Sequence, residues 1–109
     1  MTSKKPKASH NLMHKISCAT NLGGDLVKYL EDKNIFSAYH DFKNELQGAE
    51  TSPTFHWYHH ENKPFHIDYC FASIHFIERL QNVEVGSFET WAKHSDHMPL
   101  TFTFDLTSL

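Results

Sequence analysis

The sequence of 109 residues has few cysteines and no long apolar run. Its two cysteines, Cys18 and Cys70, stand far apart and match no metal-binding or redox spacing. Cys70 lies within an apolar strand pattern, which indicates a buried thiol and a reducing, cytoplasmic compartment. No apolar run approaches the ~18–20 residues of a membrane span, and no apolar stretch follows the first lysines. We therefore expect neither a membrane span nor a signal peptide.

An excess of basic residues is also missing, because ten Lys and Arg stand against thirteen Asp and Glu, for a formal net charge of −3. This balance argues against a protein that holds nucleic acid through a broad basic face. It does not exclude a protein that binds phosphates through a metal ion, since the ion then supplies the positive charge.

The sequence is instead rich in aromatic residues and histidine, with nine Phe, four Tyr, two Trp and ten His. Hydrophobic residues make up 39% and charged residues 21% of the chain, which is typical of a soluble globular protein. The length allows one small domain at most. The histidines exceed what packing in so short a chain requires.

The chain divides into a lead-in and one domain. Residues 1–21 show no steady hydrophobic period, which predicts an N-terminal arm or poorly ordered lead-in before a domain over residues 22–109. Helical spacing predicts a helix over residues 26–33, closed by Asn34 in the left-handed conformation. Further short helices are expected at 41–47 and 76–80, and strands at 54–58, 65–73, 83–85 and 100–106.

The strands at 54–58 and 65–73 are separated by turn residues and predict an antiparallel hairpin. Residues 87–99 are expected to form a loop that leads into the last strand. The pattern as a whole predicts an α+β fold with a largely antiparallel sheet.

Asp68 is the first candidate for chemistry, because it places a carboxylate inside an apolar strand, where an unpaired charge is costly. Two interpretations remain open. Asp68 accepts backbone hydrogen bonds at a strand edge, or it orients a histidine from elsewhere in the chain and stabilises the charged form of that histidine.

His97 is the obvious histidine for such a pair. It follows Ser95-Asp96 and precedes Met98-Pro99 at the start of the last strand. Adjacent side chains point in different directions, so Asp96 is poorly placed to orient His97. Asp96 is better suited to bind a divalent metal through oxygen while His97 meets a substrate. The alternative is a polar loop that ends at Pro99.

A second group of histidines comprises His56, His59, His60 and His66, with His40 as a further candidate. The His-x-x-His-His spacing suggests zinc. Strand parity weighs against it, because His56 and His59 point to opposite faces and His60 falls in the turn. Exposed turn histidines are the favoured interpretation.

Two motifs carry a resemblance to a known superfamily. Phe65-His66-Ile67-Asp68-Tyr69-Cys70-Phe71-Ala72-Ser73, followed by Ser95-Asp96-His97-Met98-Pro99-Leu100, resembles the C-terminal half of the endonuclease/exonuclease/phosphatase superfamily, which has the deoxyribonuclease-I-like fold. The similarity covers roughly residues 22–106. It implies a sheet with short helices on one face, as in one half of a four-layer α/β/β/α sandwich.

The resemblance also implies a set of roles. His97 resembles the histidine that contacts the scissile phosphate and acts in acid/base catalysis, and Asp68 resembles the aspartate that hydrogen-bonds this histidine. Asp96 resembles a carboxylate that helps to hold Mg²⁺ or Mn²⁺. The implied reaction is hydrolysis of a phosphoester, such as a nucleic acid, by metal-activated water.

The sequence departs from the superfamily in two ways. It offers no counterpart of the metal-binding glutamate, and Gly24-Asp25-Leu26-Val27 does not match the Gly-Asp-x-Asn motif. We therefore expect an incomplete phosphoesterase, inactive alone, whose sheet is covered by a separate N-terminal half or by a second copy of the chain. A non-catalytic interaction module and a histidine-rich metal binder are the alternatives.

Overall fold

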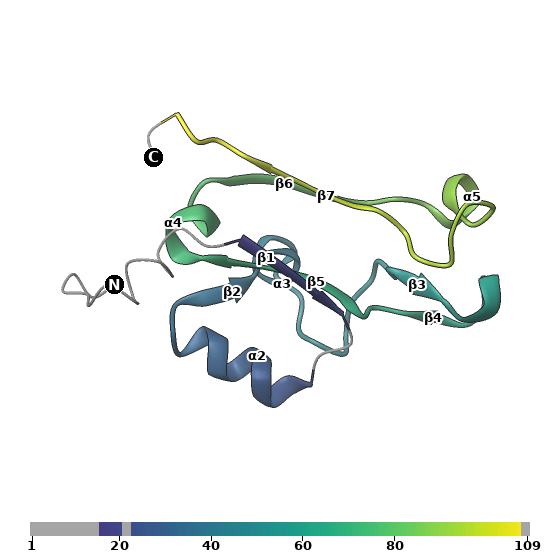
Figure 1. Cartoon of the computed structure of the whole chain (residues 1–109), viewed down its shortest axis with the longest axis horizontal. Coiled ribbons are helices and arrows are strands. Elements are labelled where there is room, and N and C mark those ends of the chain that lie inside the picture. Colours follow the sequence, from purple (N-terminus) through teal and green to yellow (C-terminus); the bar gives the residue numbers. More distant parts are fainter. Residues whose placement is uncertain (1–15, 21–22, 108–109) are drawn as a thin grey trace.

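A three-stranded antiparallel sheet lies at the centre of the computed structural model, which describes residues 16–20 and 23–107 (Figure 1). Strand β5 (Asp68–Ser73) is the middle strand. Strands β1 (Ile16–Thr20) and β2 (Ile35–Ser37) pair with its two edges. Strand β1 pairs with residues 68–72 of β5 and β2 with residues 71–73, so β5 is paired on both edges at Phe71 and Ala72.

Strand β1 corrects the prediction that residues 1–21 are an arm. Residues 16–20 pair with β5 in a regular register in which Cys18 faces Cys70 and Thr20 faces Asp68. A segment of five residues is too short for its period to stand out in a polar surrounding, and the pairing depends on a strand some 50 residues away. Residues 1–15 and 21–22 of the predicted arm lie outside the described residues.

Two hairpins extend from this sheet. Strand β3 (Phe55–His56) pairs with β4 (Pro64–Phe65) across the turn η1 (Trp57–His59), which confirms the predicted hairpin in a shorter form. Strand β6 (Leu80–Val85) pairs with β7 (Leu100–Phe104). The last strand ends two residues earlier than predicted, and Leu106, which lies beyond its end, is exposed.

The helices are short. They are α2 (Gly24–Glu31), α3 (Ala38–Lys43), α4 (Ile74–Ile77) and α5 (Phe88–Trp91). Asn34 follows α2 with a φ of 63°, as predicted from the tolerance of asparagine for the left-handed region. Helix α3 begins three residues before the predicted helix, and α5 lies in the predicted loop, where the Ser87 hydroxyl accepts a hydrogen bond from the N–H of Thr90.

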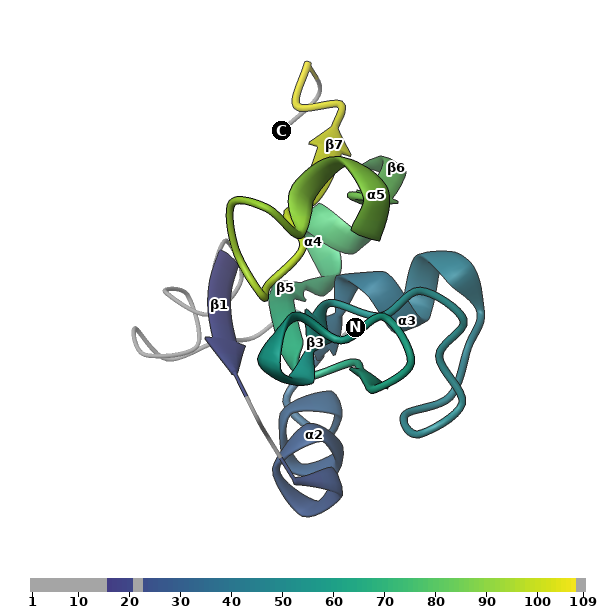
Figure 2. The ribbon, with the colours of Figure 1, turned by 90° about the vertical axis from the view of Figure 1, so that its right-hand side faces the viewer.

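The helices do not lie on one face of the sheet, which corrects the prediction. Every β5 residue from Tyr69 to Ser73 is buried. Tyr69 and Phe71 pack with α2, whereas Ala72 packs with α3, α4 and side chains of the β6–β7 hairpin. Figure 2 shows α2 and the hairpin on opposite sides of β5. Ala38 of α3 and Ala72 of β5 belong to the same buried cluster, and their small side chains let α3 approach the strand closely.

The described residues thus form a compact α+β structure of short antiparallel sheets and few helices, as the sequence pattern predicts at this level. None of the helices in the described part of the chain combines the length and apolar content needed to cross a membrane.

Candidate functional site

Asp68 and His97 lie side by side although 29 residues separate them. Asp68 begins β5, and His97 stands three residues before β7. His97 Nδ1 lies 2.8 Å from Asp68 Oδ2, within the ~2.6–3.2 Å of a catalytic hydrogen bond. The predicted contact is therefore present, while the catalytic roles of the two residues stay predictions.

The segment that carries His97 is held by an added β-bridge. Phe55 of β3 and His97 form an isolated antiparallel bridge. Around it, the Met98 N–H donates to the Thr54 carbonyl at 2.7 Å and the His56 N–H donates to the Asp96 carbonyl at 2.8 Å. These backbone bonds fix the position of the histidine relative to β3.

Thr54 connects this bridge to the segment that carries Asp68. Its side chain is fully buried, and its hydroxyl accepts hydrogen bonds from the N–H groups of Ile67 at 3.0 Å and Asp68 at 3.1 Å. Its carbonyl accepts from Met98. Thr54 therefore places Asp68 and His97 relative to each other. Sequence reasoning missed it, because a threonine at a strand entrance is common.

The contact with Asp68 also selects the tautomer of His97. A carboxylate oxygen accepts a hydrogen bond, so Nδ1 carries the hydrogen, and Nε2 is the nitrogen left to exchange a proton with a substrate. The ring packs against Phe55, with centroids 4.8 Å apart. The His97 side chain is 43% exposed and that of Asp68 is 19% exposed, so the histidine is accessible while its partner is sheltered.

Asp96 does not complete a magnesium site among the described residues. Mg²⁺ binds oxygen ligands in a near-octahedral arrangement. In the described part of the chain, the group of His, Cys, Asp and Glu side chains close enough to share a metal ion is His40, Glu50 and His66, which includes neither Asp96 nor its neighbours. The described residues thus supply Asp96 as one oxygen ligand at most and no complete Mg²⁺ site, and no step of the chemistry below passes through a metal.

The predicted histidine group divides between different places. His56 is buried with its ring 4.6 Å from that of Phe88, and this burial lowers its pKa. His59 and His60 are exposed, and His59 Nδ1 lies 2.9 Å from the Ala92 carbonyl. A zinc site built from these residues with His66 is not formed, because β3 and its turn direct them apart.

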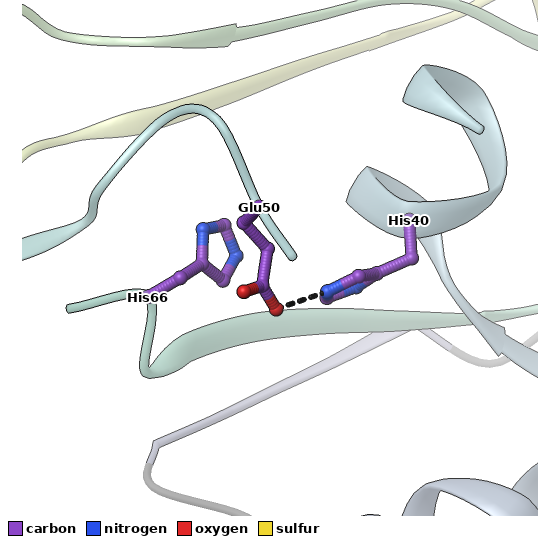
Figure 3. A group of neighbouring side chains, drawn as sticks. All are labelled: His40, Glu50 and His66. Carbon is purple, nitrogen blue, oxygen red and sulfur yellow. Dashed lines mark hydrogen bonds and ion pairs between the residues drawn. The ribbon is translucent and has the colours of Figure 1, made fainter. Parts of the chain in front are cut away.

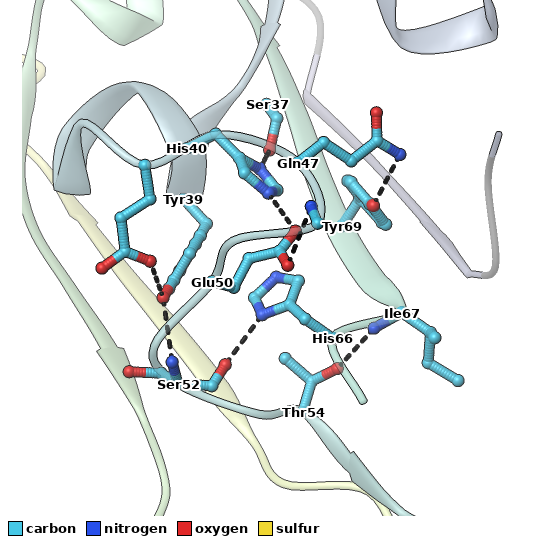
Figure 4. A network of polar contacts seen from close by, with 12 residues as sticks. Ser37, Tyr39, His40, Gln47, Glu50, Ser52, Thr54, His66, Ile67 and Tyr69 are labelled. Carbon is cyan, nitrogen blue, oxygen red and sulfur yellow. Dashed lines mark hydrogen bonds and ion pairs between the residues drawn. The ribbon is translucent and has the colours of Figure 1, made fainter. Parts of the chain in front are cut away.

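His66 instead meets His40, together with Glu50, in a polar network between α3 and β5 (Figure 4). His40 Nε2 lies 2.6 Å from Glu50 Oε2. His40 Nδ1 lies 2.6 Å from Ser37 Oγ, and His66 Nδ1 lies 2.8 Å from the Ser52 carbonyl. Sequence reasoning gave no role to Glu50, which comes from a loop whose path the sequence pattern does not reveal.

Comparisons of the chain with protein-family models, with curated proteins and with solved structures gave no match. The geometry of the site is that of an accessible histidine held by a sheltered carboxylate, on an α+β scaffold.

Proposed function

We propose that this chain is the C-terminal portion of a metal-dependent phosphoesterase of the endonuclease/exonuclease/phosphatase type. The observation that carries the proposal is the 2.8 Å contact between His97 Nδ1 and Asp68 Oδ2, formed by the two motifs on which the resemblance rests. The superfamily assigns these residues to one acid/base pair.

In the proposed reaction, His97 exchanges a proton at Nε2 with an oxygen of the phosphoester or with the attacking water. Asp68 keeps the hydrogen on Nδ1 and stabilises the imidazolium that forms when Nε2 takes up a proton. Thr54 and the β-bridge at Phe55 hold the pair in place, so little reorganisation is needed when the proton moves.

The proposed site is incomplete in this chain. On the resemblance, Asp96 contributes one oxygen to a Mg²⁺ or Mn²⁺ ion, and the remaining ligands come from an N-terminal half, as a preceding segment or a separate chain. Exposed aromatic residues around Phe55 support a partner or substrate at this end of the molecule, namely Trp57, Tyr58 and Phe65. Their rings can stack on bases, which favours a nucleic acid among phosphoesters.

The test supplies the other half. The chain is combined with an N-terminal half of a deoxyribonuclease-I-like enzyme that contains the metal-binding glutamate and Gly-Asp-x-Asn. Hydrolysis of bis(p-nitrophenyl) phosphate is then followed with Mg²⁺ or Mn²⁺. We expect activity in the complex, reduced by about 10²–10⁴-fold in His97→Ala and nearly as far in Asp68→Ala, because paired groups act as a unit.

His94→Ala is the matched control, because this exposed histidine lies in the same loop and its ring contacts Trp91 rather than Asp68. It should leave the rate unchanged. Hydrolysis that is equal in the parent and in His97→Ala, or absent from a complex that forms, would contradict the proposal. Either result would favour a non-catalytic interaction module.

A further inference from the structure

Three metal-binding side chains converge on one point away from His97. His40 comes from α3, Glu50 from the loop that follows α3, and His66 from the segment between β4 and β5 (Figure 3). One ligand atom from each lies within 4.8 Å of the other two. The side chains of His40 and Glu50 are only 13% and 8% exposed, so this is an enclosed group rather than a surface cluster.

The hydrogen bonds of His66 leave one ring nitrogen ready to bind a metal. Nδ1 lies 2.8 Å from the Ser52 carbonyl, which can only accept, so the hydrogen is on Nδ1 and the lone pair is on Nε2. Nε2 is buried and has no hydrogen-bond partner among the described residues. Leaving such an atom unpaired costs free energy, and a metal ion would satisfy it.

The other two side chains are also oriented by neighbours. His40 Nε2 lies 2.6 Å from Glu50 Oε2 and donates its hydrogen to this carboxylate in the metal-free chain. A metal ion at Nε2 would require the other tautomer, with the hydrogen on Nδ1 donated to Ser37 Oγ, which lies 2.6 Å away. The Gly48 N–H donates to Glu50 Oε1 at 3.1 Å, and the second oxygen, Oε2, faces His40. Metal-bound histidines in proteins usually donate the second ring N–H to a carboxylate, a backbone carbonyl or water, and the Ser52 carbonyl is such a partner for His66.

We propose that His40, Glu50 and His66 bind one divalent transition-metal ion of the zinc type. Two imidazole nitrogens and one carboxylate oxygen are the ligand set of open zinc sites, in which the fourth position is left to water or another ligand. In a tetrahedral site with bonds of ~2.0–2.1 Å, ligand atoms lie roughly 3.3 Å apart. The ligand atoms, which lie within 4.8 Å of one another, must therefore close by up to about 1.5 Å, while the 2.6 Å contact between His40 Nε2 and Glu50 Oε2 must open.

The surroundings suit such an ion. The ring of Tyr39 lies 4.3 Å from that of His66, and the ring of Tyr69 stacks on His40 at 5.4 Å. A pocket of about 520 Å³ is lined in part by Glu50, His66 and Tyr69, and it gives the ion access and leaves room for a fourth ligand.

This site is separate from the proposed phosphoesterase pair, since it shares no residue with His97, Asp68 or Asp96. Its ligand set also differs from that of Mg²⁺, which prefers oxygen. The zinc site can therefore exist whether or not the chain takes part in phosphoester hydrolysis. A bound ion would join α3, the Glu50 loop and the start of β5.

The test titrates the chelator-treated chain with Zn²⁺ against a chromophoric zinc indicator. We expect one tightly bound equivalent that a thousandfold excess of Mg²⁺ does not displace. His66→Ala should abolish this equivalent. Ser37→Ala should weaken it by about 10–100-fold, because Ser37 only orients His40. His59→Ala, which changes an exposed histidine outside the group, should leave it intact.

Glu50→Gln is the second test, in case His66→Ala does not fold. It keeps the shape of the side chain and removes the charged ligand. Amide NMR spectra should show a folded chain while zinc affinity falls by at least tenfold. Binding of Co²⁺ should give the intense visible bands of a tetrahedral site in the parent alone. Absence of a tight zinc equivalent in the parent, or equal affinity in the parent and in folded His66→Ala or Glu50→Gln, would overturn the proposal.

Discussion

At the scale of single residues, buried polar groups decide where the candidate site forms. Thr54 has no exposed surface, yet its hydroxyl and backbone hydrogen-bond three segments. The side-chain hydroxyl is the acceptor for two backbone N–H groups, those of Ile67 and Asp68. Loss of this oxygen would leave both donors unpaired, which costs more than the bonds themselves contribute.

We predict that Thr54→Val destabilises the fold by about 1–3 kcal/mol, because the isosteric methyl group cannot accept these hydrogen bonds. Thr54→Ser keeps the hydroxyl oxygen and lacks only a methyl group, so its free energy of unfolding should fall by less. Urea unfolding followed by circular dichroism gives both free energies. A Thr54→Val variant as stable as Thr54→Ser would show that the hydroxyl does not hold the two segments.

The cysteines allow a second prediction at this scale. Cys70 is buried opposite the exposed Cys18, and burial, with Cys18 beside it, raises the pKa of Cys70 to about 12. At pH 8 the Cys70 thiol therefore stays protonated, and the thiolate is the reactive form. Iodoacetamide should therefore modify Cys18 in the folded chain and reach Cys70 only in urea. Equal labelling of both in the folded chain, read by peptide mass spectrometry, would contradict this.

The residues of the candidate site differ in how far the sequence reveals them. Asp68 and His97 stand in motifs, and a carboxylate inside an apolar strand requires a partner, so their contact was predictable. Glu50 and Thr54 carry no such signal. Their roles depend on how a loop closes over α3 and on which backbone groups remain unpaired, and both are tertiary properties.

At the scale of elements, the sequence pattern predicted most of the helices and strands but not all of the strand pairings or which faces are covered. The buried thiol predicted for Cys70 is confirmed, and β5 is buried on both faces, because the face that carries Cys70 also carries the small residue Ala72. Strand β1 escaped detection because its pairing is wholly non-local. The early start of α3 reflects packing of Ala38 against the sheet, which outweighs the local pattern.

The turn after β6 offers a prediction at this scale. A Cβ on Gly86 would lie 2.6 Å from Trp91 Cδ1 and 2.7 Å from the ring of Pro99, so a larger residue must push both away. We expect Gly86→Ala to destabilise the fold by about 1–3 kcal/mol and to shift the amide NMR signals of His97 and Met98.

Gly24→Ala is the matched control. Its Cβ would have one ordinary contact, 3.4 Å from Gln47 Oε1, and alanine favours the helical conformation. This variant should be as stable as the parent or more stable. If Gly86→Ala and the parent are equally stable in urea, Trp91 and Pro99 move aside for the added methyl group without loss of stability, which would contradict the prediction.

At the scale of the whole molecule, the histidines of the described chain serve different ends. One forms the pair with Asp68, two lie in the proposed zinc site, and His56 is buried in an apolar contact with Phe88. Burial of imidazole makes stability depend on pH, because the charged form is poorly accommodated. The carboxylate of Glu45 affects stability at a lower pH. Hydrogen bonds from Thr51 and then from Tyr39 lower its pKa to about 2.

We predict a loss of stability in two separate ranges of pH. The pKa values of His56 and His66 are lowered by burial, so below pH 6.5 the unfolded chain binds protons that the folded chain does not. The free energy of unfolding should therefore stay level from pH 8 to 7 and fall as the pH drops below 6.5. The contribution of Glu45 is present above its ordinary pKa of 4.5 and is lost only as the pH falls toward 2.

His56→Phe separates the two histidines, because phenylalanine keeps the contact with Phe88 and cannot take up a proton. In the presence of a chelator, which removes any effect of bound metal, this variant should show a smaller fall between pH 7 and 5 than the parent. The two proteins are compared by the slope of the free energy of unfolding against pH and not by its absolute value, because the substitution also changes packing. A parent that is equally stable at pH 7 and 5, or a variant with the full slope, would mean that His56 is charged in the folded chain without cost, contrary to its burial beside Phe88.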